Sequence, residues 1–393
     1  MKAVTWQGKG RMVVEQVPDP RIIQPDDAII KVTSTGLCGS DLHLYDPLAS
    51  FMTEGDIVGH EPIGIVEEVG AGLTALKPGD RVVVPFTISC GTCWMCGEGL
   101  HSQCETTQNL EHGTGASLFG YSKLYGQVPG AQAEYLRVPF GDTLPIKVPD
   151  GPPDDRFVFL SDVLPTAWQA VEYAGLRPDD TLLVLGAGPI GDMCARIAMH
   201  RGHRVIVADP VPERRARTAA YGAEVLASED EAPALAQIRE LTRGRGADSV
   251  IDAVGMEAHG SPTTQSTSKV VSLLASRRTR PSARTAGVDR LAALHFAIDA
   301  VRRGGTVSVV GVYGGTMDPM PLMELFDKQI QLRMGQANVH RWSGEILDLL
   351  LEPEDHLGVE SFATHHLALD DAPQAYRDFR DKRGGMVKVL FRP

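Results

Sequence analysis

The chain has 393 residues, of which 43% are hydrophobic, and its 50 acidic and 38 basic residues give a formal net charge of −12. This apolar content excludes a disordered chain, the acidic balance argues against a nucleic-acid partner, and the length suggests two or three domains. The longest apolar stretch, Thr181 to Met199, contains Asp192 and Arg196 and is unsuited to crossing a membrane. Since no apolar leader follows Met1 either, we expect a cytoplasmic protein with no membrane partner.

Residues 1 to about 150 form a first region of short strands and turns. Runs rich in Val and Ile predict strands at Ala28–Thr33, Gly64–Val69 and Arg81–Val84. Gly and Pro punctuate these runs, as in Lys77-Pro78-Gly79-Asp80. The pattern is typical of a small, mostly antiparallel β-barrel.

Two polar segments in this region carry possible metal ligands. The first is Cys38-Gly39-Ser40-Asp41-Leu42-His43, and the second is Gly59-His60-Glu61. A catalytic zinc ion needs three protein ligands and an open position, and Cys38 and His60 could be two of these ligands. Taken singly, a cysteine and a histidine are explained equally well as core residues, so the spacing alone leaves both interpretations open.

Four of the six cysteines form a cluster within fifteen residues, namely Cys90, Cys93, Cys96 and Cys104. In a reducing cytosol such a cluster indicates a metal site rather than disulfides. Zinc binds four thiolates tetrahedrally in closed structural sites, so we predict a structural zinc lobe at about residues 88–106. The segment from Phe86 to Leu110 contains no Lys or Arg, which argues against a phosphate-binding zinc finger.

From about residue 163 to 337 strands and helices alternate, which predicts a parallel sheet with helices on both faces. Strands are predicted at Thr181–Leu185, Val205–Ala208, Glu224–Leu226, Ser249–Ile251, Val307–Val310 and Ile330–Leu332, and helices at Pro189–His200 and Pro212–Tyr221. The stretch 261–290, rich in Ser, Thr and Arg, is either a solvated insertion or a lid over an anionic cofactor or a subunit contact. The tail 338–393 is too short for a domain, so we expect it to return to the first region.

The sequence Gly186-Ala187-Gly188-Pro189-Ile190-Gly191 fits G-x-G-x-x-G between a predicted strand and a predicted helix. In a dinucleotide site the first glycine makes the turn, the second admits the pyrophosphate, and the third lets helix and strand pack closely. Asp209, eighteen residues past Gly191, could bind the ribose hydroxyls and repel a 2′-phosphate, which favours NAD over NADP. Arg214 and Arg215 leave that preference open, and an ordinary strand–helix turn is the plain alternative.

Together these motifs resemble, in kind and in order, those of the zinc-dependent medium-chain alcohol dehydrogenases over essentially the whole chain. The subgroup of glutathione-independent formaldehyde dehydrogenases and dismutases is the most similar, on the phrase Ser161-Asp162-Val163-Leu164-Pro165-Thr166-Ala167-Trp168 and the 261–290 insertion. The resemblance implies an α/β fold in two domains. These are a GroES-like antiparallel β-barrel catalytic domain (1–162, completed by 338–393) and a Rossmann coenzyme domain with a doubly wound parallel sheet (163–337).

The resemblance also implies two zinc ions per subunit, a structural one in the cysteine cluster and a catalytic one. The catalytic ion would be held by Cys38, His60 and Asp162, the last at a place where some members of the family carry cysteine. Glu61 would be able to take the open position in the resting state. Asp41 would orient His60 from behind.

Further roles follow from the same resemblance. Ser40 and His43 would form a proton relay, although Ser40 could merely cap a helix starting at Asp41 and His43 could be a surface histidine. Phe86 would be a wall of the substrate pocket, with plain core packing as the alternative.

The resemblance also assigns cofactor contacts. Thr166 and the backbones of Val310 and Val312 would contact the nicotinamide, and Arg214 would lie near the adenosine ribose. We expect Lys388 to be an exposed lysine of the tail rather than a phosphate ligand, and Cys194 to be a packed core thiol.

We therefore expect an NAD-dependent oxidoreductase that transfers hydride between NAD and a primary or secondary alcohol, or an aldehyde hydrate. The resemblance suggests a homodimer or a homotetramer. A polyol or threonine-type dehydrogenase is the alternative within this class, and a non-catalytic zinc-binding structural or interaction protein on the same scaffold is the alternative outside it. The joint presence of the catalytic-zinc ligands and the relay pair favours catalysis.

Overall fold

The computed structural model describes residues 1–46, 48–228, 230–255, 291–313 and 320–393, so the predicted insertion at 261–290 lies outside the described residues. The chain folds into two compact units. The first comprises Met1–Thr166 and Ala337–Pro393, and the second comprises Ala167–Gln336. Among the described residues, no helix is both long enough and apolar enough to cross a membrane.

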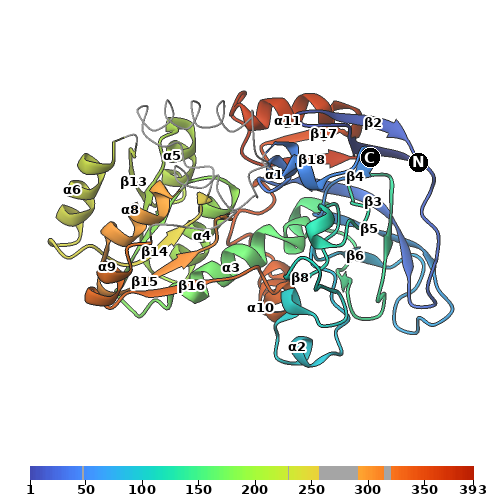
Figure 1. Ribbon diagram of the computed structural model, residues 1–393, viewed down its shortest axis with the longest axis horizontal. Helices are drawn as coiled ribbons and strands as arrows, with labels where there is room; N and C mark the ends of the chain where they lie inside the picture. The colour runs from blue at the N-terminus through green and yellow to red at the C-terminus, as the bar shows by residue number, and fades with distance from the viewer. Residues whose placement is uncertain (47, 229, 256–290, 314–319) are drawn as a thin grey trace, which may run out of the picture. The chain divides into compact units, whose positions relative to one another are not determined.

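The first unit is built around the long strand β3 (Ala28–Leu37), which pairs antiparallel with β5 (Pro62–Val69), β9 (Tyr135–Val138) and β18 (Val389–Arg392). The other strands of this sheet are β6 (Arg81–Val83), β10 (Ile146–Lys147) and β17 (His365–Ala368). The order β10-β6-β5-β3-β18-β17 contains one parallel pair, β17 with β18. The last strand of the chain thus completes the first unit, where Figure 1 also places both termini.

Smaller elements surround this sheet. A three-stranded sheet contains β1 (Lys2–Trp6), β2 (Met12–Gln16) and β4 (Asp56–Ile57), and a two-stranded one contains β7 (Gln108–Asn109) and β8 (Thr114–Ala116). The helices of this unit are α1 (Asp41–Tyr45), α2 (Trp94–Gly97), α10 (Val339–Leu351) and α11 (Ala372–Arg380). The buried Arg156 donates hydrogen bonds to the carbonyls of Leu350, Glu352 and Glu354, and so satisfies acceptors at the end of α10.

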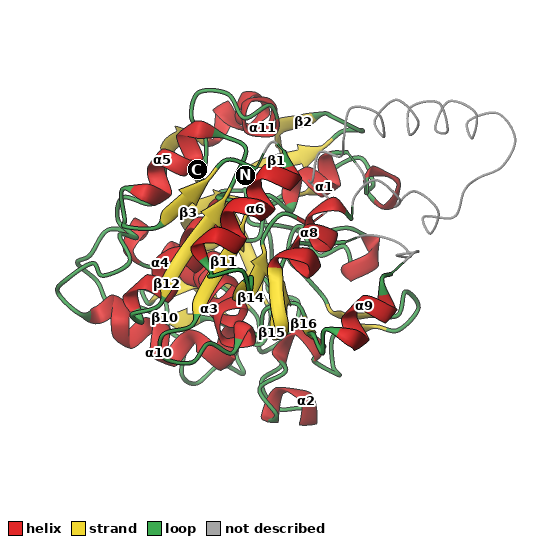
Figure 2. Cartoon of the chain, turned by 90° about the vertical axis from the view of Figure 1, so that its left-hand side faces the viewer, coloured by secondary structure: helices red, strands yellow, loops and turns green. Residues whose placement is uncertain are grey.

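The second unit is a six-stranded sheet in which every pair is parallel, in the order β13-β12-β11-β14-β15-β16. Its strands are β11 (Thr181–Leu185), β12 (Arg204–Ala208), β13 (Glu224–Leu226), β14 (Ala247–Asp252), β15 (Val301–Val309) and β16 (Gln331–Met334). Its helices among the described residues are α4 (Pro189–His200), α5 (Pro212–Ala219), α6 (Glu231–Leu241), α8 (Ala292–Ala300) and α9 (Leu322–Asp327), together with most of α3 (Val163–Ala174). Figure 2 looks onto this unit, with its strands side by side among the helices.

The sequence of these strands explains why helices cover both faces of the sheet. Leu183, Val250 and Val307 are fully buried in one core with apolar side chains of α6 and α8. On the other face, the hydroxyls of Ser249 and Ser308 donate hydrogen bonds to carbonyls of α3. Strands buried on both faces are typical of parallel sheets, and the predicted α/β fold class is confirmed.

Candidate active site

Four possible metal ligands meet in the first unit, and each of Cys38, His60, Glu61 and Asp162 places one ligand atom within 4.8 Å of the others. The strand register explains this meeting. Because β3 and β5 pair antiparallel with Thr35 opposite Pro62, the residues that follow β3 lie beside those that precede β5. Asp162 comes from the start of α3, directly after a buried 3-10 turn.

The spacing of these atoms fits a zinc ion. Asp162 Oδ2 lies 3.3 Å from His60 Nε2 and 3.6 Å from Cys38 Sγ. Ligand atoms about 2.0–2.3 Å from a tetrahedral zinc ion lie roughly 3.3–3.8 Å from one another. Two buried atoms of the group, Glu61 Oε1 and His60 Nδ1, have no hydrogen-bond partner among the described residues, and Glu61 Oε1 is therefore available as a further metal ligand.

The electrostatics of the group also suit a cation. Burial lowers the pKa of His60, but the carboxylates of Asp41 and Asp162 outweigh it and raise this pKa well above its ordinary value. Burial and the neighbouring carboxylate of Asp162 raise the pKa of Cys38 to about 11. Without metal, the imidazole therefore holds a proton where a metal ion would supply the positive charge.

Lys388 contradicts the expectation of an exposed tail lysine. Its side chain is fully buried, because Lys388 directly precedes the buried strand β18 and has apolar neighbours in the sequence. Lys388 Nζ donates hydrogen bonds to the Glu61 carboxylate and, at 3.1 Å, to the carbonyl of Leu37. Burial lowers the pKa of Lys388, but the Glu61 carboxylate outweighs it and raises this pKa. Burial also raises the pKa of Glu61, and the charge of Lys388 offsets this only in part. In the sequence, Lys388 is the only charged residue of the apolar run 386–390. A charge in such a run indicates a buried partner, because an unpaired buried charge is costly.

The remaining side chains of the predicted site surround His60. Asp41 Oδ1 lies 3.3 Å from His60 Nδ1, and Ser40 Oγ lies 3.3 Å from His60 Nε2. Ser40 precedes α1, but its side chain makes no capping hydrogen bond to the described residues, unlike the plain capping alternative. His43 lies one turn further along α1 and is buried, so the surface-histidine alternative is wrong. Thr166 donates a 2.7 Å hydrogen bond to Asp162 Oδ1.

Two aromatic rings flank the same histidine. The ring of Phe86 meets His60 edge-on at 6.2 Å between centroids, and the ring of Tyr121 does so at 6.4 Å. Sequence reasoning selected Phe86 and missed Tyr121, which no motif marks. Tyr121 also lines a cavity of about 120 Å³ together with residues 55–57 and 127–129.

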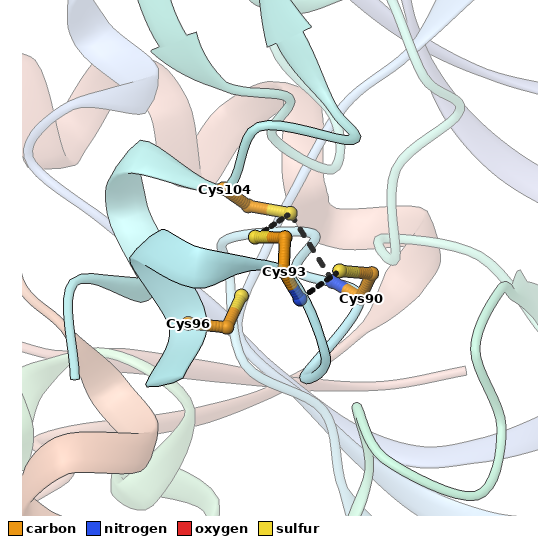
Figure 3. Close-up of side chains that lie close together, drawn as sticks. All are labelled: Cys90, Cys93, Cys96 and Cys104. Carbon is orange, nitrogen blue, oxygen red and sulfur yellow. Dashed lines mark hydrogen bonds between the residues drawn. The ribbon is translucent and has the colours of Figure 1, made fainter. Parts of the chain in front are cut away.

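The four cysteines of the predicted lobe also come together, as Figure 3 shows. The Sγ atoms of Cys93 and Cys104 are 3.9 Å apart, close to the separation expected around one zinc ion. Amides stabilise the sulfurs, since the amides of Cys90 and Glu105 donate to Cys104 and Cys93 respectively. All six cysteines of the chain are free thiols.

Hydrogen bonds lower the pKa of the Cys90 thiol, which favours the thiolate that binds metal. Burial raises the pKa of Cys90, but hydrogen bonds from the Thr106 hydroxyl and from nearby amides outweigh it and lower the pKa to about 6. The lobe is attached to α10, because Asn338 Oδ1 accepts 2.9 Å hydrogen bonds from the amide and the hydroxyl of Ser102. The donor set therefore fits a closed structural zinc site.

In the second unit the glycine turn lies between β11 and α4, as predicted. Gly186 has a φ of 87°, a conformation that favours glycine, and a Cβ at Gly191 would collide with the carbonyl of Gly186. Such close packing of strand, turn and helix is the arrangement that places a phosphate group at a helix N-terminus in dinucleotide sites.

Charged residues stand beside the turn. The buried Asp209 carboxylate accepts hydrogen bonds from the amides of Ala187, at 2.6 Å, and Val211, at 2.7 Å, so the carboxylate is fixed at the turn. The guanidinium of Arg214 approaches Gly188, with Nη1 3.7 Å from the place of a Cβ there. Val310 and Val312 follow β15 at the carboxyl edge of the sheet, and Val312 is exposed. Cys194 is a fully buried thiol of α4.

Comparison with known proteins gives two family matches. Residues 24–150 match the alcohol dehydrogenase GroES-like domain, and residues 189–269 match the zinc-binding dehydrogenase domain. The chain is 40% identical over 401 residues to an uncharacterized zinc-type alcohol dehydrogenase-like protein, AdhB, of Bacillus subtilis, with all of both chains covered. It is 30% identical over 416 residues to the formaldehyde dismutase of Pseudomonas putida, covering 100% of this chain and 97% of the relative.

A solved structure resembles the whole chain. The alcohol dehydrogenase TADH from Thermus sp. ATN1 has a TM-score of 0.80 and 35% sequence identity, covering 100% of this chain and 99% of that one. The likeness extends over both units.

Proposed function

This chain belongs to the zinc-dependent medium-chain alcohol dehydrogenase family, an oxidoreductase family that uses zinc and a nicotinamide cofactor, and from that premise we propose its specific reaction. It transfers hydride between NAD and a primary or secondary alcohol, or an aldehyde hydrate. The observation that carries the proposal is the buried group of Cys38, His60, Glu61 and Asp162, whose ligand atoms lie within 4.8 Å of one another.

In this proposal the chain carries two zinc sites with different tasks. Cys38, His60 and Asp162 hold the catalytic ion, with Glu61 in reach as a further donor, and the four lobe cysteines hold a structural ion. Zinc, when bound, supplies a Lewis acid that favours the deprotonated form of an alcohol. Asp41 keeps the His60 ring in place from behind, and Phe86 forms a wall of the substrate pocket.

The chain's own residues then move the proton and hold the cofactor. As Ser40 Oγ accepts the proton, its own hydroxyl proton leaves in the direction of His43, one turn further along α1, which takes it up. The glycine turn and the N-terminus of α4 hold the pyrophosphate, and Thr166 and the backbones of Val310 and Val312 orient the nicotinamide. NAD, when held there, would supply the hydride acceptor.

We assign the preference for NAD to Asp209, whose carboxylate is fixed at the turn, with Arg214 beside the adenosine ribose. Replacing the carboxylate in Asp209→Gly should reduce the ratio of kcat/KM for NAD to that for NADP by about 10–100-fold, since hydrogen bonds to charged groups contribute roughly 1.5–3 kcal/mol. An unchanged ratio would remove Asp209 from this role.

A single screen tests the proposed function. Purified protein is incubated with NAD and formaldehyde, short alcohols, polyols or threonine, while NADH formation and zinc content are measured. The proposal predicts turnover of short alcohols or hydrated formaldehyde, which the similarity to a formaldehyde dismutase supports. Turnover of polyols or threonine alone would favour that subclass instead, and a zinc-loaded protein that turns over no substrate would favour a non-catalytic binding role.

We also propose a cytoplasmic homodimer or homotetramer. Exposed apolar side chains of the second unit support the oligomer, namely Leu322, Met323 and Phe326 of α9 and Met334 of β16, each 54–81% exposed. Edge strand β16 adjoins α9 in sequence, and exposed edges and apolar patches of this kind favour a covering partner. Light scattering gives the assembly size directly, and a monomer would exclude this part of the proposal.

A further inference from the structure

A series of buried polar groups extends from His60 away from the ligand atoms. Beyond His60 Nδ1 lies Asp41, whose Oδ2 accepts hydrogen bonds from the amide of Cys38, at 3.0 Å, and from Gln132 Nε2, at 3.3 Å. Gln132 Oε1 in turn accepts a 2.9 Å hydrogen bond from the hydroxyl of Tyr376. Asp41, Gln132 and Tyr376 are each 0% exposed.

Tight backbone packing brings these residues together from distant parts of the first unit. Gln132 is held by backbone hydrogen bonds to Val58 and Val4, and its side chain occupies space that a Cβ at Gly59 would take. Tyr376 comes from α11, and its ring stacks on the ring of Tyr45 at 5.7 Å between centroids. The side chains therefore have little freedom to move.

The hydrogen-bond chemistry fixes the direction of the Gln132 amide. Its Nε2 donates to two acceptors, Asp41 Oδ2 and the carbonyl of Gly36, the latter at 3.2 Å. A flipped amide would turn Oε1 toward both acceptors and leave the Tyr376 hydroxyl facing an NH₂ group. Burial raises the pKa of Tyr376 well above its ordinary value, so the hydroxyl keeps its proton and favours one amide orientation.

Resting on the proposed function, we propose that Gln132 and Tyr376 are positioning residues of the catalytic metal centre. Tyr376 orients the Gln132 amide, Gln132 orients the Asp41 carboxylate, and Asp41 holds the His60 ring so that Nε2 faces Cys38 and Asp162. A ligand held in this way is already ordered when the metal arrives, which strengthens metal binding.

A purely structural role predicts a different result from a positioning role. Loss of a buried hydrogen bond lowers stability wherever it occurs, but it changes the affinity for a metal only if it orders a ligand. The variants Tyr376→Phe and Gln132→Met remove the hydrogen bonds while keeping similar side-chain volumes. Tyr45→Phe is the matched control, because Tyr45 shares the ring stack and makes no side-chain hydrogen bond to the described residues.

The experiment measures metal binding rather than turnover alone. The catalytic site is emptied with a chelator under conditions that leave the lobe zinc in place, and Co²⁺ is titrated while the cobalt–thiolate absorption is recorded. Gln132→Met and Tyr376→Phe should weaken Co²⁺ binding by about 10–100-fold, the range expected for partners of a metal-bound histidine, and Tyr45→Phe should not.

The outcomes separate this inference from the proposed function. If both chain variants keep the wild-type Co²⁺ affinity and spectrum and lose only thermal stability, the positioning role is overturned. Tyr376→Phe alone decides the question if Gln132→Met does not fold. If the wild-type protein itself gives no cobalt–thiolate band, it is the proposed catalytic site that fails.

Discussion

The two candidate metal sites of the first unit are assembled in opposite ways. The lobe takes four identical donors from one loop of fifteen residues, and nearby amides and hydroxyls stabilise its sulfurs. The catalytic group takes mixed donors from residues 38 to 162, and its Glu61 is paired with Lys388, the residue directly before the last strand. A closed structural site can thus be built from one short segment of the chain. A site with an additional possible ligand and buried charges needs residues from distant parts of the unit.

The histidines near the two sites show the same contrast. His60 lies between carboxylates, which raise its pKa despite its burial. Beside the lobe, the rings of His101 and His340 lie 5.2 Å apart between centroids. Burial and the neighbouring His101 lower the pKa of His340 to about 4. The protonated form is therefore favoured for His60, and the neutral form for His340.

The largest effect is expected from Asp162→Ala. The substitution removes a metal ligand of the catalytic group and leaves the lobe unchanged, so the lobe should keep its zinc. Loss of a residue that only hydrogen-bonds a metal ligand costs about 10–100-fold, so loss of the ligand itself should lower activity by more than about 100-fold. Steady-state kinetics and metal analysis measure both. Asp162→Cys is the matched control, because a thiolate keeps the charge and still binds zinc. Full activity in Asp162→Ala would refute the ligand assignment.

The next largest effect concerns the buried ion pair, for which the lobe has no counterpart among its described residues. Lys388→Met leaves the Glu61 carboxylate buried without its counter-charge, which should lower the free energy of unfolding by about 3–5 kcal/mol. Urea unfolding measures the change. The double variant with Glu61→Gln should recover most of it, and equal losses in the single and double variants would contradict the pairing.

The smallest effect is a pH dependence beside the lobe. Because the pKa of His340 is lower in the folded protein than in the unfolded chain, the unfolded chain binds more protons between about pH 6.5 and 4. Stability should therefore fall as the pH falls through this window, by up to about 3 kcal/mol from His340. His340→Gln should flatten the curve, and His112→Gln, at an exposed histidine just past the lobe, is the surface control. Identical curves for all three proteins would contradict this account.

Helices and strands whose bounds are set by residues adjacent in the sequence could be predicted. Strand Thr181–Leu185 and helix Pro189–His200 have the predicted bounds, since an apolar run, a glycine turn and a proline at the first helical turn mark them. The helix starting at Pro212 ends at Ala219, two residues earlier than predicted. Strand β15 begins at Val301, whereas the sequence predicted a start at Val307. Its first five residues include two arginines and two glycines, which interrupt the apolar pattern by which a strand is predicted.

Long-range contacts could not be predicted in the same way. Gln132 and Tyr376 belong to no motif, and only strand register and the docking of α11 bring them behind Asp41. Lys388 looked like a solvated residue because its partner lies 327 positions away in the chain. The residues that surround the metal ligands, Gln132, Tyr376 and Lys388, thus cannot be found from the spacing of motifs in the sequence.

The zinc content of three purified proteins, measured together with their activity, tests the central claim most directly. The account predicts two zinc ions in the wild type, one in Cys104→Ser with measurable activity, and one in Asp162→Ala without it. Activity that disappears with the lobe zinc and survives the loss of the other ion would contradict the division of tasks between the two sites.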